Sequence, residues 1–132
     1  MNATDTLRGL RVLIAEDNFL IGESLRDLLV DLGCVVIGPV PDLGEVMSVI
    51  KAGGFDAALL DFHLGDANIL PAATELASRG IPFIITSGGG SPVGLPTLLA
   101  RAPRLNKPFD ARRLEEAMDG ALLPRGGVAL AG

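Results

Sequence analysis

The chain has 132 residues, of which 48% are hydrophobic and 20% are charged, and its formal net charge at pH 7 is −5. This length and composition predict one folded domain with a single core and exclude an intrinsically disordered chain. The negative charge argues against nucleic acid as a partner of this domain. The apolar stretches are shorter than the roughly 18 residues that a membrane span needs, so no membrane partner is expected.

The two ends of the chain and its single cysteine indicate where the protein is located and where its folded core ends. The start, residues 1–6, lacks the basic segment and apolar centre of a signal peptide, so we expect a cytoplasmic protein. Cys34 lies within an apolar run and is expected to be a buried, reduced thiol rather than a redox sensor. The Gly-rich residues 123–132 are expected to form a flexible tail after a core of about residues 8–122.

Short apolar runs alternate with stretches of helical periodicity along the chain. The apolar runs predict strands at residues 10–15, 34–38, 55–60 and 82–86 and around Leu105. The helical spacing predicts helices at about residues 19–32, 43–50, 69–78 and 111–122, the last with Asp110 as its N-cap. Residues 88–106 contain four Gly and three Pro, so only Pro96 to Arg101 is expected to form a short helix there.

The strands are apolar throughout rather than alternating, which is typical of a parallel sheet covered by helices on both faces. Five successive βα units in one small domain predict a doubly wound α/β fold of the flavodoxin type. We therefore expect a five-stranded parallel sheet with strand order 2-1-3-4-5 and a short or irregular fourth helix.

Polar residues follow the ends of four of these strands. Asp17, Asp61, Ser87 and Lys107 come after the first, third, fourth and fifth strands, and Glu16 precedes Asp17. In the expected strand order these four strands are neighbours, and right-handed crossovers bring their carboxyl ends to one edge. Clustered carboxylates favour a divalent cation, and a hydroxyl and a lysine suit phosphoryl oxygens. The set predicts a phosphate-accepting aspartate.

This pattern resembles the receiver domains of two-component response regulators, which are CheY-like. The resemblance covers about residues 8–122 and rests on Glu16-Asp17, Asp61, Ser87 and Lys107-Pro108-Phe109. It implies that residues 1–132 form a single receiver domain, which acts as a phosphoprotein in signal transduction.

Within that family the chain is similar to the alphaproteobacterial single-domain receivers known as FATGUY, named for a Pro-Phe-x-Phe-Ala-Thr-Gly-Tyr signature. The corresponding stretch here runs from Pro82 to Gly89. The resemblance implies that Ser87 occupies the hydroxyl position. Thr86 is the alternative if the alignment shifts by one residue.

The resemblance implies a role for each site residue. Asp61 would accept a phosphoryl group from a histidine kinase or a histidine phosphotransfer protein, with only weak autophosphorylation and autodephosphorylation of its own. Mg²⁺ would be bound by Asp17, Asp61 and the backbone carbonyl of His63, with Glu16 acting through a water. Lys107 and Ser87 would contact the phosphoryl oxygens.

One departure from the family pattern concerns output. Receivers usually carry an aromatic residue three positions before the lysine, where this chain has Arg104. We expect the switch to involve Arg104 together with Thr86, Gly88 and Gly89, and the signal to pass to a downstream protein that the sequence does not identify.

Several simpler interpretations remain open. Glu16 and Asp17 suit a helix N-terminus, and Lys107 suits a solvated loop. A phosphatase of the haloacid dehalogenase type would need Asp-x-Asp after its first strand, whereas Asp61-Phe62-His63 follows the third. A phosphorylation-independent, receiver-like docking module is the stronger alternative, and acid-labile phosphorylation distinguishes it from an active receiver.

Overall fold

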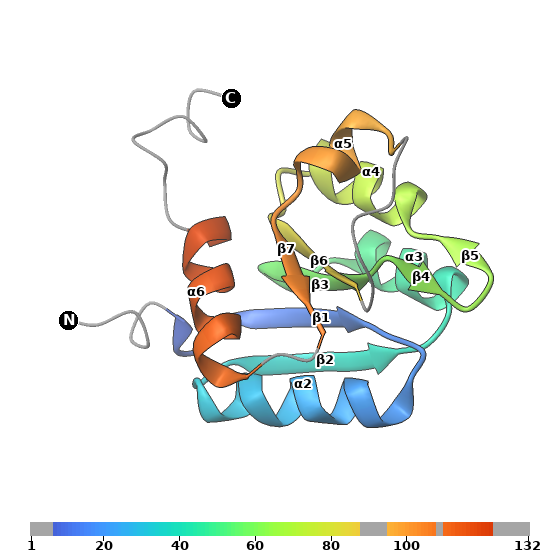
Figure 1. The fold of residues 1–132 in the computed structure, drawn as a ribbon. Coiled ribbons are helices and arrows are strands. Elements are labelled where there is room, and N and C mark those ends of the chain that lie inside the picture. The colour runs from blue at the N-terminus through green and yellow to red at the C-terminus, as the bar shows by residue number, and fades with distance from the viewer. Residues whose placement is uncertain (1–6, 88–94, 108–109, 123–132) are drawn as a thin grey trace.

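The computed structural model describes residues 7–87, 95–107 and 110–122 (Figure 1). A five-stranded parallel sheet lies at its centre, in the order β2-β1-β3-β6-β7. Its strands are β1 Arg11–Ala15, β2 Val35–Val40, β3 Ala57–Asp61, β6 Phe83–Ser87 and β7 Arg104–Asn106. In chain order this is the predicted order 2-1-3-4-5, so the predicted fold class is confirmed.

Helices cover both faces of the sheet (Figure 1). They are α2 Phe19–Asp31, α3 Leu43–Ala52, α4 Leu70–Ser78, α5 Thr97–Arg101 and α6 Ala111–Leu122. Asn18, Asp42 and Asp110 each accept a hydrogen bond from the backbone N–H three residues ahead, which stabilises the first turns of α2, α3 and α6. The expected N-cap at Asp110 is thus confirmed, and α5 is the short helix expected between the last two strands.

Strand side chains alternate between two apolar clusters, one on each face. One cluster joins Leu60 and Ile85 to α3, α4 and α5. The other joins Leu59 and Ile84 to α2 and α6. Burial on both faces explains why the strands read as continuous apolar runs. Cys34 is buried in the second cluster, as expected.

Two parts of the backbone differ from the expectation. The second strand continues past Gly38 and a cis Gly38–Pro39 bond to Val40, where the sequence indicated an end at Gly38. Its pairing with β1 shifts register at that point. Helix α2 packs closely there, because a Cβ on Gly22 would lie 2.6 Å from the Pro39 Cγ.

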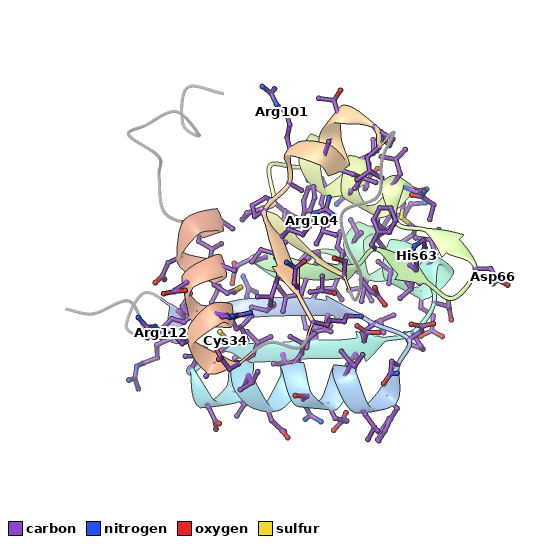
Figure 2. All side chains as sticks on the ribbon, in the orientation of Figure 1. Cys34, His63, Asp66, Arg101, Arg104 and Arg112 are labelled. Atoms are coloured by element: carbon purple, nitrogen blue, oxygen red, sulfur yellow. The ribbon has the colours of Figure 1, made fainter. Side chains whose placement is uncertain are left out.

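A second, small sheet was not predicted. Strands β4 His63–Leu64 and β5 Ala67–Asn68 pair antiparallel directly after β3. Gly65, with φ of 62°, and Asp66 form the turn between them. Figure 2 shows His63 and Asp66 on this hairpin at the periphery of the molecule.

Some expectations lie outside the described residues, namely the flexible tail at 123–132 and the positions of Gly88, Gly89, Pro108 and Phe109. Among the helices that are described, none is long and apolar enough to cross a membrane.

Candidate functional site

The carboxyl ends of four neighbouring strands bring the predicted polar residues to one edge of the sheet. Glu16 and Asp17 follow β1, Asp61 ends β3, Ser87 ends β6 and Lys107 follows β7. Carboxylate oxygens of Glu16, Asp17 and Asp61 lie within 4.8 Å of one another. Glu16 is 2% exposed and Asp61 7% exposed, whereas Asp17 is exposed to solvent. The site therefore has a buried floor and an open side.

Lys107 provides a positive charge in this cluster. Its Nζ lies 3.0 Å from Glu16 Oε1 and 3.4 Å from Asp61 Oδ1. Its backbone N–H donates to the Ser87 carbonyl at 2.8 Å, which fixes the start of the side chain beside β6. Lys107 is thus a partner of two buried carboxylates rather than a solvated loop cation.

Glu16 has the most perturbed environment in the site. Its pKa is raised to about 7, chiefly by burial and then by a hydrogen bond with Asp61. The Asn18 N–H, which donates to Oε2 at 3.1 Å, and the Lys107 ammonium act in the opposite direction. Without a cation, Glu16 therefore keeps its proton to a higher pH than an ordinary glutamate does.

The β4–β5 hairpin contacts two of the acidic residues. The His63 N–H donates to Asp61 Oδ1 at 3.3 Å, and the Gly65 N–H donates to Asp17 Oδ2 at 2.9 Å. The exposed His63 ring lies edge-on to Phe62, with ring centroids 4.6 Å apart. The sequence reasoning missed this hairpin, although a Gly65-Asp66 pair between two short runs is a two-residue turn signal.

The two candidate hydroxyls occupy different faces of the sheet. Asp61 pairs directly with Thr86, so these residues share a face, and Ser87 projects to the other. Ser87 Oγ lies 3.4 Å from Asn106 Oδ1, to which it donates. Asn106 is a neighbour of the site that the sequence reasoning did not identify.

Arg104 lies on the Ser87 face, because β6 and β7 pair in register. Its Nη2 donates to the Leu99 carbonyl of α5 at 3.3 Å. Figure 2 shows Arg104 on the side of β7 that faces α5. The expected switch residue is therefore tethered to the short helix that follows the undescribed residues 88–94.

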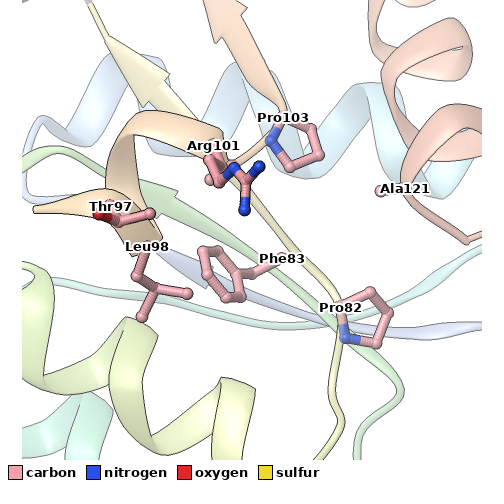
Figure 3. A pocket seen from close by; sticks show the side chains of 8 residues that line it. Pro82, Phe83, Thr97, Leu98, Arg101, Pro103 and Ala121 are labelled. Carbon is pink, nitrogen blue, oxygen red and sulfur yellow. The ribbon is translucent and has the colours of Figure 1, made fainter. Parts of the chain in front are cut away.

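An apolar cavity of about 550 Å³ lies away from these residues, beside the amino end of β6 (Figure 3). Phe83, Leu98 and Pro103 line it, and Arg101 extends over it. Because the acidic residues lie at the opposite end of the strands, this cavity is separate from the candidate site.

The donor set at the acidic edge suits a hard divalent cation, which prefers several oxygen ligands. Glu16, Asp17 and Asp61 offer such oxygens, and a cation would relieve the repulsion that Lys107 now offsets in part. The parallel sheet and this edge together define a CheY-like receiver architecture.

Comparison with known proteins agrees with that class. The solution structure of SdrG from Sphingomonas melonis Fr1 is 33% identical, with a TM-score of 0.77, and the match covers 93% of this chain and 100% of SdrG. The BeF3-activated conformation of SdrG, from Pseudomonas melonis Fr1, is 34% identical, with a TM-score of 0.73 and coverages of 86% and 96%. No family model matches the chain.

Two other similarities are more limited. The receiver domain of sensor histidine kinase PA1611 from Pseudomonas aeruginosa PAO1, which has a magnesium ion in its active site cleft, shares the fold at 23% identity and a TM-score of 0.74, over 86% of this chain and 97% of that one. The transcriptional regulatory protein PdtaR of Mycobacterium tuberculosis is 32% identical over 75 residues, which is 57% of this chain. This match spans only 37% of PdtaR.

The chain belongs to the response regulator receiver family of two-component signalling, as its match to the whole of SdrG shows. Its Glu16, Asp17 and Asp61 form an acidic cluster whose carboxylate oxygens could hold a metal ion.

Proposed function

We propose that this protein is a cytoplasmic, single-domain response regulator of the FATGUY type. Asp61 accepts a phosphoryl group from a histidine kinase or a histidine phosphotransfer protein, and the signal leaves through protein contacts. The observation that carries this proposal is the placement of Asp61, a buried carboxylate 3.4 Å from the Lys107 ammonium and within 4.8 Å of two further carboxylates. The similarity to SdrG, over 93% of this chain and 100% of that one, supports the receiver class of this proposal.

The proposed reaction is a direct transfer. An oxygen of the Asp61 carboxylate attacks the phosphorus of an N-phosphohistidine, a P–O bond forms and the P–N bond breaks. The electron pair of the broken bond stays on the imidazole nitrogen of the donor. Lys107 then stabilises the charge on a phosphoryl oxygen. Its ammonium already lies close to Asp61 Oδ1, where the phosphoryl group would be attached. Ser87 supplies a hydroxyl to another phosphoryl oxygen.

The residues present fit a Mg²⁺ ion. Asp17, Asp61 and the His63 carbonyl would bind it directly, and Glu16 would act through a water. When bound, Mg²⁺ supplies positive charge that offsets the carboxylates and the phosphoryl oxygens. The Gly65 N–H already orients Asp17 toward this cluster through its bond to Oδ2.

The switch in this proposal does not use an aromatic ring, because Arg104 stands at that position. We infer an order–disorder change across residues 88–106, whose Gly and Pro content gives little helical propensity. Within the described part of this segment, α5 has only five residues, and Arg104 holds it by one bond to Leu99. A movement of Ser87 toward the phosphoryl group would pull on the segment that follows it.

Intact-mass measurement after incubation with acetyl phosphate and Mg²⁺ tests the proposal. We expect one acid-labile addition of about 80 Da, the mass of a phosphoryl group, which disappears in Asp61→Asn and with EDTA. Asp66→Asn is the matched control, since Asp66 is a carboxylate on the exposed hairpin turn. An addition that persists in Asp61→Asn would reject Asp61. No addition in the wild-type chain with any phosphodonor would favour the docking-module alternative.

A further inference from the structure

Gly22 lies inside helix α2, although helix propensity favours only proline less than glycine. It is buried against the edge strand β2. A Cβ at this position would lie 2.6 Å from Cγ and 2.9 Å from Cβ of Pro39, which is closer than real Cβ atoms approach their neighbours. Only a residue without a side chain therefore lets α2 and β2 come together at this point.

The β2 side of this contact holds the main chain of Glu16. Val40, which follows Pro39, accepts a hydrogen bond from the Glu16 backbone N–H at 3.1 Å through its carbonyl. The second strand carries none of the predicted site residues, yet its last residue contacts the buried carboxylate residue of the site. A displacement of Pro39 would therefore move the acceptor to which Glu16 is bound.

The α2 side of the same contact holds the Glu16 side chain. The Asn18 N–H donates to Glu16 Oε2 at 3.1 Å. The Asn18 carbonyl in turn accepts from the Gly22 N–H at 2.9 Å, which ties Asn18 to the turn of α2 that contains Gly22. A Cβ at Gly22 would also lie 3.6 Å from Glu16 Cγ, so Glu16 itself packs beside the contact. A movement of α2 away from β2 would therefore shift the donor to the carboxylate.

We propose that Gly22 and Pro39 are positioning residues for Glu16, through which the packing of α2 on β2 sets the affinity of the acidic cluster for Mg²⁺. This inference rests on the proposed function. Glu16 is 2% exposed, so its carboxylate cannot turn toward solvent to escape a shift of its neighbours. Groups that orient the residues around a metal typically change its affinity by about 10- to 100-fold when they are altered. Crowding at Gly22 would thus weaken Mg²⁺ binding without removing any ligand.

Gly22→Ala tests the proposal, because it adds the one carbon atom for which the contact has no room. Gly44→Ala is the matched control, since Gly44 is an exposed glycine of α3 and a Cβ there would lie 3.4 Å from Asp42 Oδ1, an ordinary contact. Each substitution is made in the wild type and in Glu16→Gln. Mg²⁺ affinity is measured by amide chemical-shift titration well below every melting temperature, so that unfolding does not contribute.

In the wild type we expect Gly22→Ala to weaken Mg²⁺ binding about tenfold. In Glu16→Gln the same substitution should change the affinity by less than about twofold, because the charge that it displaces is already gone. Gly44→Ala should leave the affinity unchanged in both backgrounds. An unchanged affinity for Gly22→Ala, or an equal loss in both backgrounds, would overturn the inference. A wild-type chain that binds no Mg²⁺ would instead reject the proposed function.

Pro39→Ala approaches the contact from the other side and decides the matter if Gly22→Ala does not fold. It removes Cγ of the ring, so it loosens the contact with Gly22 instead of crowding it. We expect Mg²⁺ binding to weaken by at least about twofold in the wild type and to stay unchanged in Glu16→Gln. No loss in the wild type, or a loss of the same size in both backgrounds, would overturn the inference.

Discussion

The ammonium of Lys107 lies 3.0 Å from Oε1 of Glu16, a carboxylate that is 2% exposed. These residues follow β1 and β7, strands that are separated in the sheet by β3 and β6. The lysine side chain therefore extends across the site and passes Asp61, whose Oδ1 is 3.4 Å away. In the absence of a cation this contact offsets the negative charge of the cluster. A cation would free Lys107 to serve the phosphoryl group.

Mg²⁺ should stabilise the fold by mass action. At a concentration about 100 times its dissociation constant, we expect about 2.7 kcal/mol of added free energy of unfolding and a rise of several degrees in melting temperature. Asp17→Asn should remove most of this rise, because it removes a charged ligand while an amide oxygen can still accept from the Gly65 N–H. Differential scanning calorimetry with and without Mg²⁺ measures the effect.

The control for that experiment is Asp27→Asn, which changes an exposed carboxylate on α2 outside the acidic cluster. It should keep the full response to Mg²⁺. A full response in Asp17→Asn would remove Asp17 from the metal site.

The pKa of Glu16 predicts a pH dependence of stability. The folded state raises this pKa to about 7 from its ordinary value of 4.5, chiefly through burial. Between these two values the folded chain binds a proton that the unfolded chain does not, so stability must fall as pH rises through this window. The metal-free wild type should lose melting temperature between about pH 5 and pH 7 relative to Glu16→Gln, which cannot titrate.

Saturating Mg²⁺ should reduce this dependence, because the cation favours the ionised carboxylate. The wild type and Glu16→Gln are melted at several pH values under the same conditions. The difference between their melting temperatures removes the contribution of the other titrating groups. Parallel curves for the two proteins would show that Glu16 titrates normally in the fold.

The switch proposal predicts a change in amide hydrogen exchange. With beryllofluoride and Mg²⁺, exchange within residues 88–106 should slow, since the proposed ordering would protect amides in this segment. The N–H groups of α4, which precedes this segment, serve as an internal reference. Slow exchange in both states would mean that the segment is already rigid, and the order–disorder proposal would fail.

Cys34 should be unreactive in the native protein. Burial raises the pKa of its thiol, and its Sγ lies 3.6 Å from the Leu7 carbonyl in the apolar cluster under α2 and α6. Because the thiolate is the reactive form, N-ethylmaleimide should label Cys34 slowly in buffer and fully in denaturant. Rapid native labelling, detected by mass spectrometry, would reopen a redox role.

The sequence by itself determined the fold and predicted that Asp17, Asp61 and Lys107 converge at one edge of the sheet. Continuous apolar runs such as the one that ends at Asp61 indicated buried parallel strands, and the strand order followed from the repeated βα units. Once the order is known, the convergence of Asp17, Asp61 and Lys107 follows, because right-handed crossovers leave all strands with their carboxyl ends at the same edge.

Only the tertiary structure decided on which face of the sheet each side chain lies and which residues it contacts. Thr86 and Ser87 are adjacent in the sequence, but a one-residue difference in register reverses the face to which a strand residue points. The structure assigns Thr86 to the face of Asp61. The contact between Lys107 and Glu16 likewise depends on rotamers and distances across four strands, which local sequence patterns do not encode. The hairpin that holds Asp17 through Gly65 is too short for periodicity to reveal, since each of its strands has only two residues.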